Sequence, residues 1–159
     1  MACERDASSV GMYRLNVDGR DLGKFKSSGI LMSTGTGSTG WLYSAKSISP
    51  HKISHLKKLI GLKPAHDNNI DLIDYAISKR LSNATHFQVD KPELYYFVRE
   101  GFQETAISEG HCSELIFTSE MLSGEVKIDG HSVIPVNIGD RFKVTVDPQY
   151  TLKCMKFLM

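Results

Sequence analysis

Several residue types are scarce in this 159-residue sequence, and each scarcity excludes a class of protein. The three cysteines, Cys3, Cys112 and Cys154, are odd in number and widely spaced, which fits neither a disulfide framework nor a zinc knuckle. The formal net charge of +1 gives no electrostatic basis for nonspecific nucleic-acid binding. No apolar run reaches the ~18 residues that cross a bilayer. We therefore expect a reducing compartment, no nucleic-acid partner and no membrane partner.

The composition is that of an ordinary soluble globular chain. Apolar residues make up 41% of the sequence and charged residues 23%. A compact chain of this length buries roughly 70% of its unfolded surface, so a core forms without disulfides or metals. The first residues carry neither a secretory nor a transit-peptide pattern. The chain is thus either cytoplasmic or targeted by a segment outside this sequence.

One stretch, residues 27–41, dominates the sequence. It reads Ser-Ser-Gly-Ile-Leu-Met-Ser-Thr-Gly-Thr-Gly-Ser-Thr-Gly-Trp, an apolar run followed by Gly, Ser and Thr and closed by the single tryptophan, Trp41. A short apolar run between turn formers predicts a buried strand. The loop after it is where the backbone can approach a ligand.

Alternating apolar and polar residues on both sides of this loop predict a mainly β chain. The turns Asp18-Gly19 and Asp129-Gly130 suit tight hairpins between antiparallel strands. We expect a sandwich or barrel, with Cys154 in its core. The expected strands are residues 12–17, 22–25, 27–33, 94–99, 114–118, 124–129, 132–136, 141–146 and 151–157.

Between about 41 and 83 the periodicity is helical, which we interpret as a helical insertion in an α+β fold. A first helix carries Trp41, Ala45 and Ile48 and is expected to be capped by Ser38 or Thr39. A second begins with Ser49 as cap and Pro50 at the first position and ends at Gly61. Its apolar face comprises Ile53, Leu56 and Ile60. A third begins at Asp67 and carries a stripe of Ile70, Ile73 and Ile77 with Leu81 nearby, expected to be core or a subunit interface.

The loop fits the letters Gly-x-Gly-x-x-Gly at Gly35, Gly37 and Gly40, but not the context of a Rossmann fingerprint. That fingerprint requires a following parallel strand and an acidic residue about 20 positions on, and a lysine-rich helix stands there instead. A Walker loop is excluded because no lysine lies between Lys26 and Lys46. Backbone amides and the hydroxyls of Thr and Ser suit a ribose, a phosphate or an adenine edge. The alternative is a plain strand-to-helix turn with Trp41 in the core.

Residues 27–41 resemble the signature loop of the NAD kinases, in which a strand leads into Thr-x-Thr-Gly-Ser-Thr-Ala-Tyr. The Thr-Gly-Thr-Gly form that ends in Trp, preceded by Ser-Ser-Gly, is similar to the mitochondrial-type branch. Phe97-Val-Arg-Glu100 and Gly124-Glu-Val-Lys-Ile-Asp-Gly130 resemble two further segments of that branch, in the same order. The resemblance covers nearly the whole chain and implies the C-terminal domain, a twisted, mainly antiparallel β-sandwich.

The resemblance implies a set of NAD-binding residues in the loop. Ser28 stands where many members have an Asp that contacts the nucleotide, and Arg99 is a second possible contact. Arg99 with Glu100 is alternatively a salt-bridged strand end. The expected NAD-binding residues of the loop are Thr34, Thr36, Gly37, Ser38, Thr39, Gly40 and Trp41.

The family's Gly-Gly-Asp-Gly and Asn-Glu motifs, which resemblance places before this segment, do not occur in the sequence. We therefore expect no catalytic residue in this chain and no activity from it alone. The implied activity is NAD kinase, with NAD(H) and ATP as partners, Mg only in the full-length enzyme, a homodimer and a mitochondrial location. The alternative is a catalytically silent truncated isoform that binds nucleotide or oligomerises, and a Rossmann dehydrogenase is a third hypothesis.

No other pattern predicts a second site. His51 and His55 lack the glutamate of a zinc-protease helix, and we expect both to be solvated. The remaining histidines, His66, His86, His111 and His131, are expected in loops or turns without ligand spacing, so no metal site is predicted. The lysines Lys52, Lys57 and Lys58 are expected to form a solvated helix face.

Overall fold

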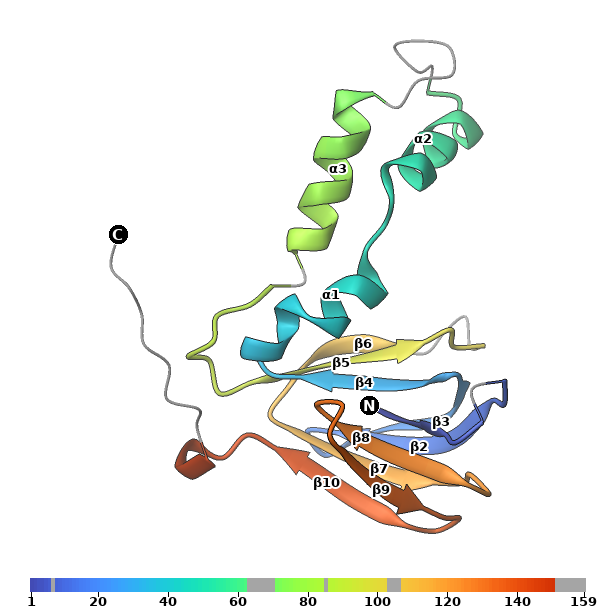
Figure 1. The fold of residues 1–159 in the computed structure, drawn as a ribbon, viewed down its shortest axis with the longest axis vertical. Coiled ribbons are helices and arrows are strands. Elements are labelled where there is room, and N and C mark those ends of the chain that lie inside the picture. Colours follow the sequence, from blue (N-terminus) through green and yellow to red (C-terminus); the bar gives the residue numbers. More distant parts are fainter. Residues whose placement is uncertain (7, 63–70, 85, 103–106, 151–159) are drawn as a thin grey trace. The chain divides into compact units, whose positions relative to one another are not determined.

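The computed structural model describes residues 1–6, 8–62, 71–84, 86–102 and 107–150. The chain divides into two compact units. The sheet unit comprises Met1–Thr34 and Asp90–Met159, and the helical unit comprises Gly35–Val89. Figure 1 shows the strands of the first and the helices of the second. Within the described residues, no helix is long and apolar enough to cross a membrane.

The sheet unit is a sandwich of two antiparallel sheets, as the sequence predicts. Every pair of described strands is antiparallel. The six-stranded sheet has the order β6 (Glu109–Cys112), β5 (Leu94–Arg99), β4 (Gly29–Ser33), β1 (Ala2–Glu4), β8 (Gly124–Ile128), β9 (Ser132–Val136). The four-stranded sheet has the order β10 (Arg141–Thr145), β7 (Glu114–Ser119), β2 (Gly11–Val17), β3 (Arg20–Ser27), and a short helix η2 (Pro148–Tyr150) follows β10.

Asp-Gly pairs form both predicted hairpin turns. Asp18 and Gly19 have φ of 49° and 81°, and Asp129 and Gly130 have φ of 47° and 73°. Two consecutive positive φ angles match the right-handed twist of the strands they join. These turns therefore fix the register of the β2–β3 and β8–β9 hairpins.

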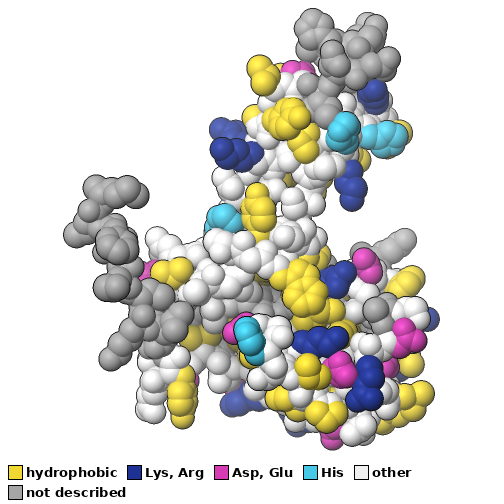
Figure 2. All heavy atoms as spheres, viewed as in Figure 1, with side chains coloured by type: hydrophobic (Ala, Val, Ile, Leu, Met, Phe, Trp, Pro, Cys, Tyr) yellow, Lys and Arg dark blue, Asp and Glu magenta, His cyan; other side chains and the backbone are white. Residues whose placement is uncertain are grey.

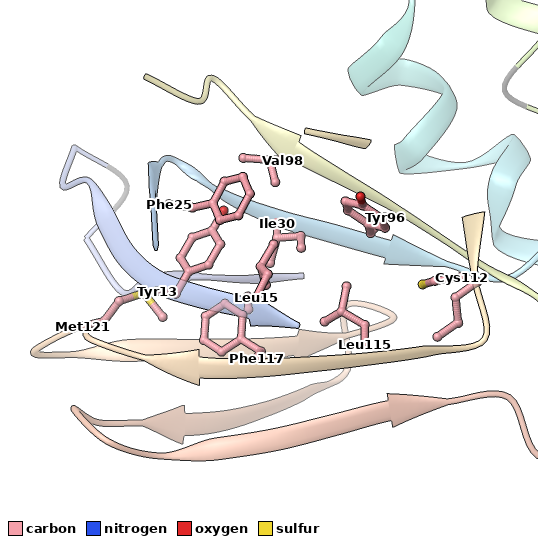
Figure 3. Close-up of a cluster of buried hydrophobic side chains, with 12 residues drawn as sticks. Tyr13, Leu15, Phe25, Ile30, Tyr96, Val98, Cys112, Leu115, Phe117 and Met121 are labelled. Atoms are coloured by element: carbon pink, nitrogen blue, oxygen red, sulfur yellow. The ribbon is translucent and has the colours of Figure 1, made fainter. Parts of the chain in front are cut away.

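The core lies between the two sheets and is built from alternate strand residues (Figure 3). Tyr13 and Leu15 of β2 are 0% and 1% exposed. The Tyr13 ring stacks on Phe117 with centroids 4.7 Å apart, and its hydroxyl lies 2.6 Å from the Ser27 Oγ. Burial raises the pKa of Tyr13. The predicted alternation over 12–17 thus places Tyr13 in the core.

The sequence does not predict β1, which occupies the middle of the six-stranded sheet. Ala2 pairs with Ile30 on one side and Val126 on the other, and it is fully buried. Gly29 permits this close approach, since its φ is 136° and a Cβ there would lie 2.6 Å from the Ala2 carbonyl oxygen. A three-residue strand has too little alternation to be recognised. Hydrogen bonding to β4 on one edge and to β8 on the other makes these residues a strand instead.

Two further strand predictions need correction. The strand expected over 27–33 begins at Gly29, because β3 continues through Ser27 and residue 28 joins the two. Strand β6 was not predicted, since Glu109–Cys112 is short and polar. The expected strand over 151–157, with Cys154, lies outside the described residues.

The helical unit contains η1 (Thr36–Thr39), α1 (Trp41–Lys46), α2 (Pro50–Leu59) and α3 (Leu72–Asn83). The α2 start is as predicted, with Pro50 at the first position and the Ser49 side chain accepting from the Lys52 amide. Of the predicted apolar face, Ile53 is buried at 6% exposure, but Leu56 and Ile60 are 51% and 71% exposed. The face is therefore only partly covered.

Helix α3 differs from the prediction in its start and its orientation. It begins at Leu72, because Asp71 is an extended N-cap that forms a capping box with Asp74. Asp67 and Ile70 lie outside the described residues. Of the two predictions for the stripe, a place in the core is wrong, since Ile73 is 56% and Leu81 44% exposed, and a subunit interface stays a prediction.

A polar stripe of α3 faces the rest of the helical unit instead. The side chains of Asp74, Ser78 and Ser82 recur every four residues and so lie on one side of the helix. Asp74 Oδ1 accepts from Lys57 Nζ at 2.8 Å, and Ser78 Oγ donates to the Ile48 carbonyl at 2.6 Å. The Ser82 Oγ lies 3.5 Å from the Ser47 Oγ. Hydrogen bonds rather than apolar packing thus orient α3.

Lys57 was expected to be solvated, and this expectation is wrong. Its side chain is only 15% exposed, and its ammonium lies 2.8 Å from Asp74 and 3.6 Å from Asp71. Its neighbours Lys52 and Lys58 are exposed, as expected. The correction follows from tertiary packing, because a lysine on a basic helix meets a carboxylate only when another helix supplies it.

Candidate functional site

The glycine-rich loop follows the last residue of β4. Ser33 ends the strand, Thr34 follows it, and η1 and α1 come after Gly35 and Gly40. Five of the residues predicted to bind nucleotide expose polar groups or backbone to solvent. These are Thr34, Thr36, Gly37, Thr39 and Gly40.

Ser38 differs from the other hydroxyl residues of the loop because it is 1% exposed. Its Oγ donates to the Gly35 carbonyl at 2.7 Å, and its amide donates to the same carbonyl at 3.2 Å. Ser38 therefore holds the turn together. It does not cap α1, and neither does Thr39, because the N-cap is Gly40, which offers no side-chain acceptor.

Gly35 is required by packing rather than by backbone conformation. A Cβ at Gly35 would lie 2.4 Å from the Gln88 carbonyl oxygen, nearer than real Cβ atoms approach. The segment around Gln88 is thus packed against Gly35 of the loop.

The strand that leads into the loop excludes the Rossmann hypothesis. Among the described strands, β4 pairs only with β1 and β5, and both pairs are antiparallel, whereas a Rossmann unit requires a parallel sheet.

Trp41 is not a core residue, so the plain-turn alternative is wrong on this point. Its side chain is 52% exposed, and Leu42, at 2%, is the residue that α1 buries. An exposed indole presents a large flat surface with one N–H donor. It is suited to stack on a planar ring.

Ser28 and Arg99 are the two further residues that the resemblance gives as possible nucleotide contacts. Ser28 directly precedes β4 and is hydrogen-bonded to Arg99, the last residue of β5. The Ser28 amide and Oγ both point to the Arg99 carbonyl oxygen, at 3.2 and 3.4 Å. The Arg99 guanidinium lies 3.8 Å from Glu100, whose side chain is 72% exposed. This is the predicted salt-bridged strand end, and an exposed pair of this kind contributes little to stability.

The structure also aligns a row of side chains that the sequence does not predict. Ser33 pairs with Tyr95, and Tyr95 pairs with His111, so the three lie side by side on β4, β5 and β6. Their neighbours Met32, Tyr96 and Cys112 face the core, so the row faces the opposite side of the sheet.

A glutamate supports the histidine of this row. The His111 Nδ1 lies 3.1 Å from Glu93, and its ring meets Tyr95 edge-on at 4.9 Å. His111 was expected in a loop, which is wrong, because it belongs to β6. Only strand register brings it into one row with Ser33, from which Tyr95 separates it. Ser33 is one residue before the predicted binding residue Thr34.

The remaining His, Cys, Asp and Glu residues of the described ranges were searched for a metal site. Among the described residues, no three His, Cys, Asp or Glu side chains could hold a metal ion. His51, His55, His86 and His131 are exposed, and His66 lies outside the described residues. Cys3 and Cys112 are free and buried, and burial raises the pKa of the Cys112 thiol to about 11.

The fold matches solved NAD kinases. The chain aligns with "Crystal structure of an NAD kinase from Archaeoglobus fulgidus in complex with ATP" at a TM-score of 0.56 and 15% identity, covering 91% of this chain and 43% of that one. It aligns with "Crystal Structure of Yeast NADH Kinase complexed with NADH" at a TM-score of 0.58 and 13% identity, covering 94% and 34%. At these identities the likeness establishes the fold.

A sequence comparison agrees with the likeness in fold to NAD kinases. The chain is 26% identical over 148 residues to NAD kinase 2, mitochondrial, of Xenopus tropicalis, which covers 88% of this chain. The match spans 34% of that relative's length, in its C-terminal part. No protein-family model matches the chain. The resemblance to the C-terminal portion of a mitochondrial-type NAD kinase, predicted from the loop, is confirmed.

Proposed function

We propose that this chain is the nucleotide-binding half of an NAD kinase, which transfers a phosphoryl group from ATP to the 2′-hydroxyl of the adenosine ribose of NAD. The observation that carries the proposal is the loop at 34–41, in a chain related to NAD kinase 2. Its exposed hydroxyls and backbone suit a ribose and a phosphate, and the exposed Trp41 suits an adenine ring.

Within this proposal the loop residues have different roles. Thr34, Thr36 and Thr39 offer hydroxyls to the nucleotide, while Gly37 and Gly40 allow its close approach. Ser38 keeps the turn in shape through its bond to the Gly35 carbonyl. A bound nucleotide positioned in this way loses the motional freedom that otherwise opposes phosphoryl transfer.

The chemical step itself is assigned to residues outside this sequence. The family resemblance implies an aspartate that takes the proton from the 2′-hydroxyl, and that motif is not among the 159 residues. The described residues also offer no carboxylate cluster for Mg²⁺. The chain spans about a third of the length of its curated relative, so we assign binding to it and catalysis to a longer form.

Two measurements test this function. Calorimetric titration of the chain with NAD should show binding that the double variant Thr36→Val/Thr39→Val abolishes, whereas Thr145→Val on β10 leaves it unchanged. A longer form that includes the preceding segment should convert NAD and ATP to NADP. Unchanged NAD binding in the double variant, together with no NADP from the longer form, would reject the proposal. Binding without NADP formation in any longer form would favour the silent-module alternative.

The homodimer and the mitochondrial location implied by the resemblance are part of this proposal. The curated relative is a mitochondrial protein by name, which supports the location. Light scattering of the purified chain tests the dimer, and fractionation of cells that express the longer form tests the location. A monomer at all concentrations, or a cytosolic longer form, would reject the corresponding part.

A further inference from the structure

The segment that follows α3 contacts both the glycine-rich loop and the helix after the loop. We call this segment, residues 86–88, the bracing segment. The His86 amide donates a hydrogen bond to the carbonyl of Asn83, the last residue of α3, over 3.0 Å. The position of the bracing segment is therefore tied to the end of α3.

The first contact of the bracing segment is with the start of the loop. A Cβ on Gly35 would lie 2.8 Å from the Gln88 carbonyl carbon and 2.9 Å from the Val89 Cα. These are backbone atoms, which do not move aside as the end of a flexible side chain does. Gly35 is thus packed directly against backbone at the point where the chain enters η1.

The second contact is with α1. The rings of Tyr43 and His86 have their centroids 5.2 Å apart and are tilted by 39°. Tyr43 follows Trp41 by two residues, and each residue turns an α-helix by about 100°, so the two side chains leave α1 on nearly opposite sides. The His86 ring therefore contacts the side of α1 that lies opposite Trp41.

Helix α1 is short and has no side-chain cap. An isolated helix of fewer than about 12 residues is marginal in water, and α1 has six. Of these six residues, all of them described, Leu42 is the one that is buried. One buried side chain does not by itself fix the rotation of a helix about its axis. A contact on the Tyr43 side supplies the second point that fixes this rotation.

The rotation of α1 decides where its indole points. Hydrophobic and histidine side chains reach the surface of the helical unit (Figure 2), and Trp41 is 52% exposed. An exposed side chain on a helix that rotates would sample several directions. Holding the opposite side of the helix in place gives the indole one direction before a ligand arrives.

We propose that the bracing segment is a positioning element of the nucleotide site, in which His86 fixes the direction of Trp41 through Tyr43. The inference rests on the function proposed above, because the ligand that Trp41 meets is the nucleotide. His86 acts through α1, so it is a positioning residue. Its effect on affinity comes from preorganisation, since a site that is already ordered loses less freedom when the ligand binds.

Fluorescence of the single tryptophan tests this proposal without any nucleotide. His86→Ala keeps the backbone bond to Asn83 and removes the ring, so we expect lower Trp41 anisotropy and stronger quenching by acrylamide. His86→Phe keeps a ring and should restore both values. His55→Ala, at an exposed position on α2, is the matched control and should change neither. Unchanged fluorescence in His86→Ala, or an equal change in His55→Ala, would overturn the proposal.

Titration with NAD tests the consequence for binding. Loss of one ring contact should weaken NAD binding about five-fold in His86→Ala and in Tyr43→Leu. The double variant should bind as either single variant does, because both changes remove the same contact. Additive losses would overturn the pairing of the two rings. Absence of NAD binding by the unaltered chain would reject the proposed function instead, and Trp41 fluorescence would still decide whether His86 positions the indole.

Discussion

Lys57 of α2 donates a hydrogen bond to Asp74 of α3 over 2.8 Å, and the carboxylate that accepts it is only 1% exposed. Asp74 Oδ2 also accepts from the Asp71 amide at 3.1 Å, so one carboxylate joins the start of α3 to α2. An uncompensated buried charge is costly, which makes this contact a condition for the pairing of the helices.

Removing the ammonium should therefore loosen the helical unit. We expect Lys57→Met to increase amide hydrogen exchange in α2 and α3 while the strands of the core keep their protection. Lys58→Met, one residue along on the exposed side of α2, is the matched control and should change little. Equal exchange in the two variants would show that the Lys57–Asp74 contact does not join the helices.

The same contact predicts a pH dependence of the helical unit. The hydrogen bond from Lys57 lowers the pKa of Asp74 below its ordinary 3.8, and the bond to Asp74 raises the pKa of Lys57 above its ordinary 10.5. The Asp74 contribution is complete above pH 3.8 and is lost as pH falls through the lowered pKa. The Lys57 contribution is complete below pH 10.5 and is lost as pH rises through the raised pKa.

Far-ultraviolet circular dichroism between pH 2 and 7 should therefore show the helical signal falling at the acid end, at about pH 4 or below. In Asp74→Asn this acid transition should be weaker, because the titrating group is gone. An acid transition of the same size in both proteins would assign it to other carboxylates.

Gly29→Ala should destabilise the sheet unit by about 2–4 kcal/mol. The new Cβ meets the Ala2 carbonyl oxygen and the Cys3 Cβ, both in the neighbouring central strand, and the positive φ adds strain. Gly139→Ala is the control, because its φ is also positive but no atom lies within 4 Å of the added Cβ. Urea unfolding should show the smaller loss for Gly139→Ala. Equal losses would mean that β1 moves away at no cost.

The buried contact between Tyr13 and Ser27 predicts an asymmetric pair of variants. In Tyr13→Phe the Ser27 Oγ keeps its partners, the amide and carbonyl of Gly29, so we expect a loss of about 1 kcal/mol. In Ser27→Ala the Tyr13 hydroxyl loses its partner inside the core, and the loss should be about 1–3 kcal/mol. Thermal unfolding of both variants measures the difference, and a larger loss in Tyr13→Phe would contradict it.

In the loop, Ser38→Ala and Thr39→Val should separate a structural role from a binding role. Ser38→Ala removes the bond to the Gly35 carbonyl, so we expect a lower melting temperature together with weaker NAD binding. Thr39 is exposed, so Thr39→Val should weaken NAD binding and leave the melting temperature unchanged. NAD titration and differential scanning calorimetry on both variants provide the measurements. Identical behaviour of the two would reject the division of roles.

Much of the fold is specified locally. Strict alternation predicts β2, β5 and β7, and the Asp18-Gly19 and Asp129-Gly130 pairs predict the hairpin turns. The Ser49-Pro50 start of α2 is also local, because a side chain and an amide three residues apart satisfy each other. These features need no distant partner, and they were predicted correctly.

Features that depend on a distant partner were missed. Strand β1 exists because residues near 30 and 126 offer it two edges, and His111 joins Ser33 and Tyr95 only through strand register. The sequence shows which side chains are present, but it does not show which strands pair with one another. Short or polar strands have no periodicity of their own that would reveal it.

The sequence by itself determined the sandwich of antiparallel strands, the helical insertion and the glycine-rich loop that resembles an NAD kinase. Only the tertiary structure decided which side of α3 turns inward. Apolar spacing favoured the side of Ile73, but Lys57, Ile48 and Ser47 present a charge and hydrogen-bonding groups to the other side. These partners satisfy Asp74, Ser78 and Ser82, so the polar side of α3 can be buried without leaving a charge or hydroxyl unpaired. The polar side therefore faces inward, and the apolar side remains outside.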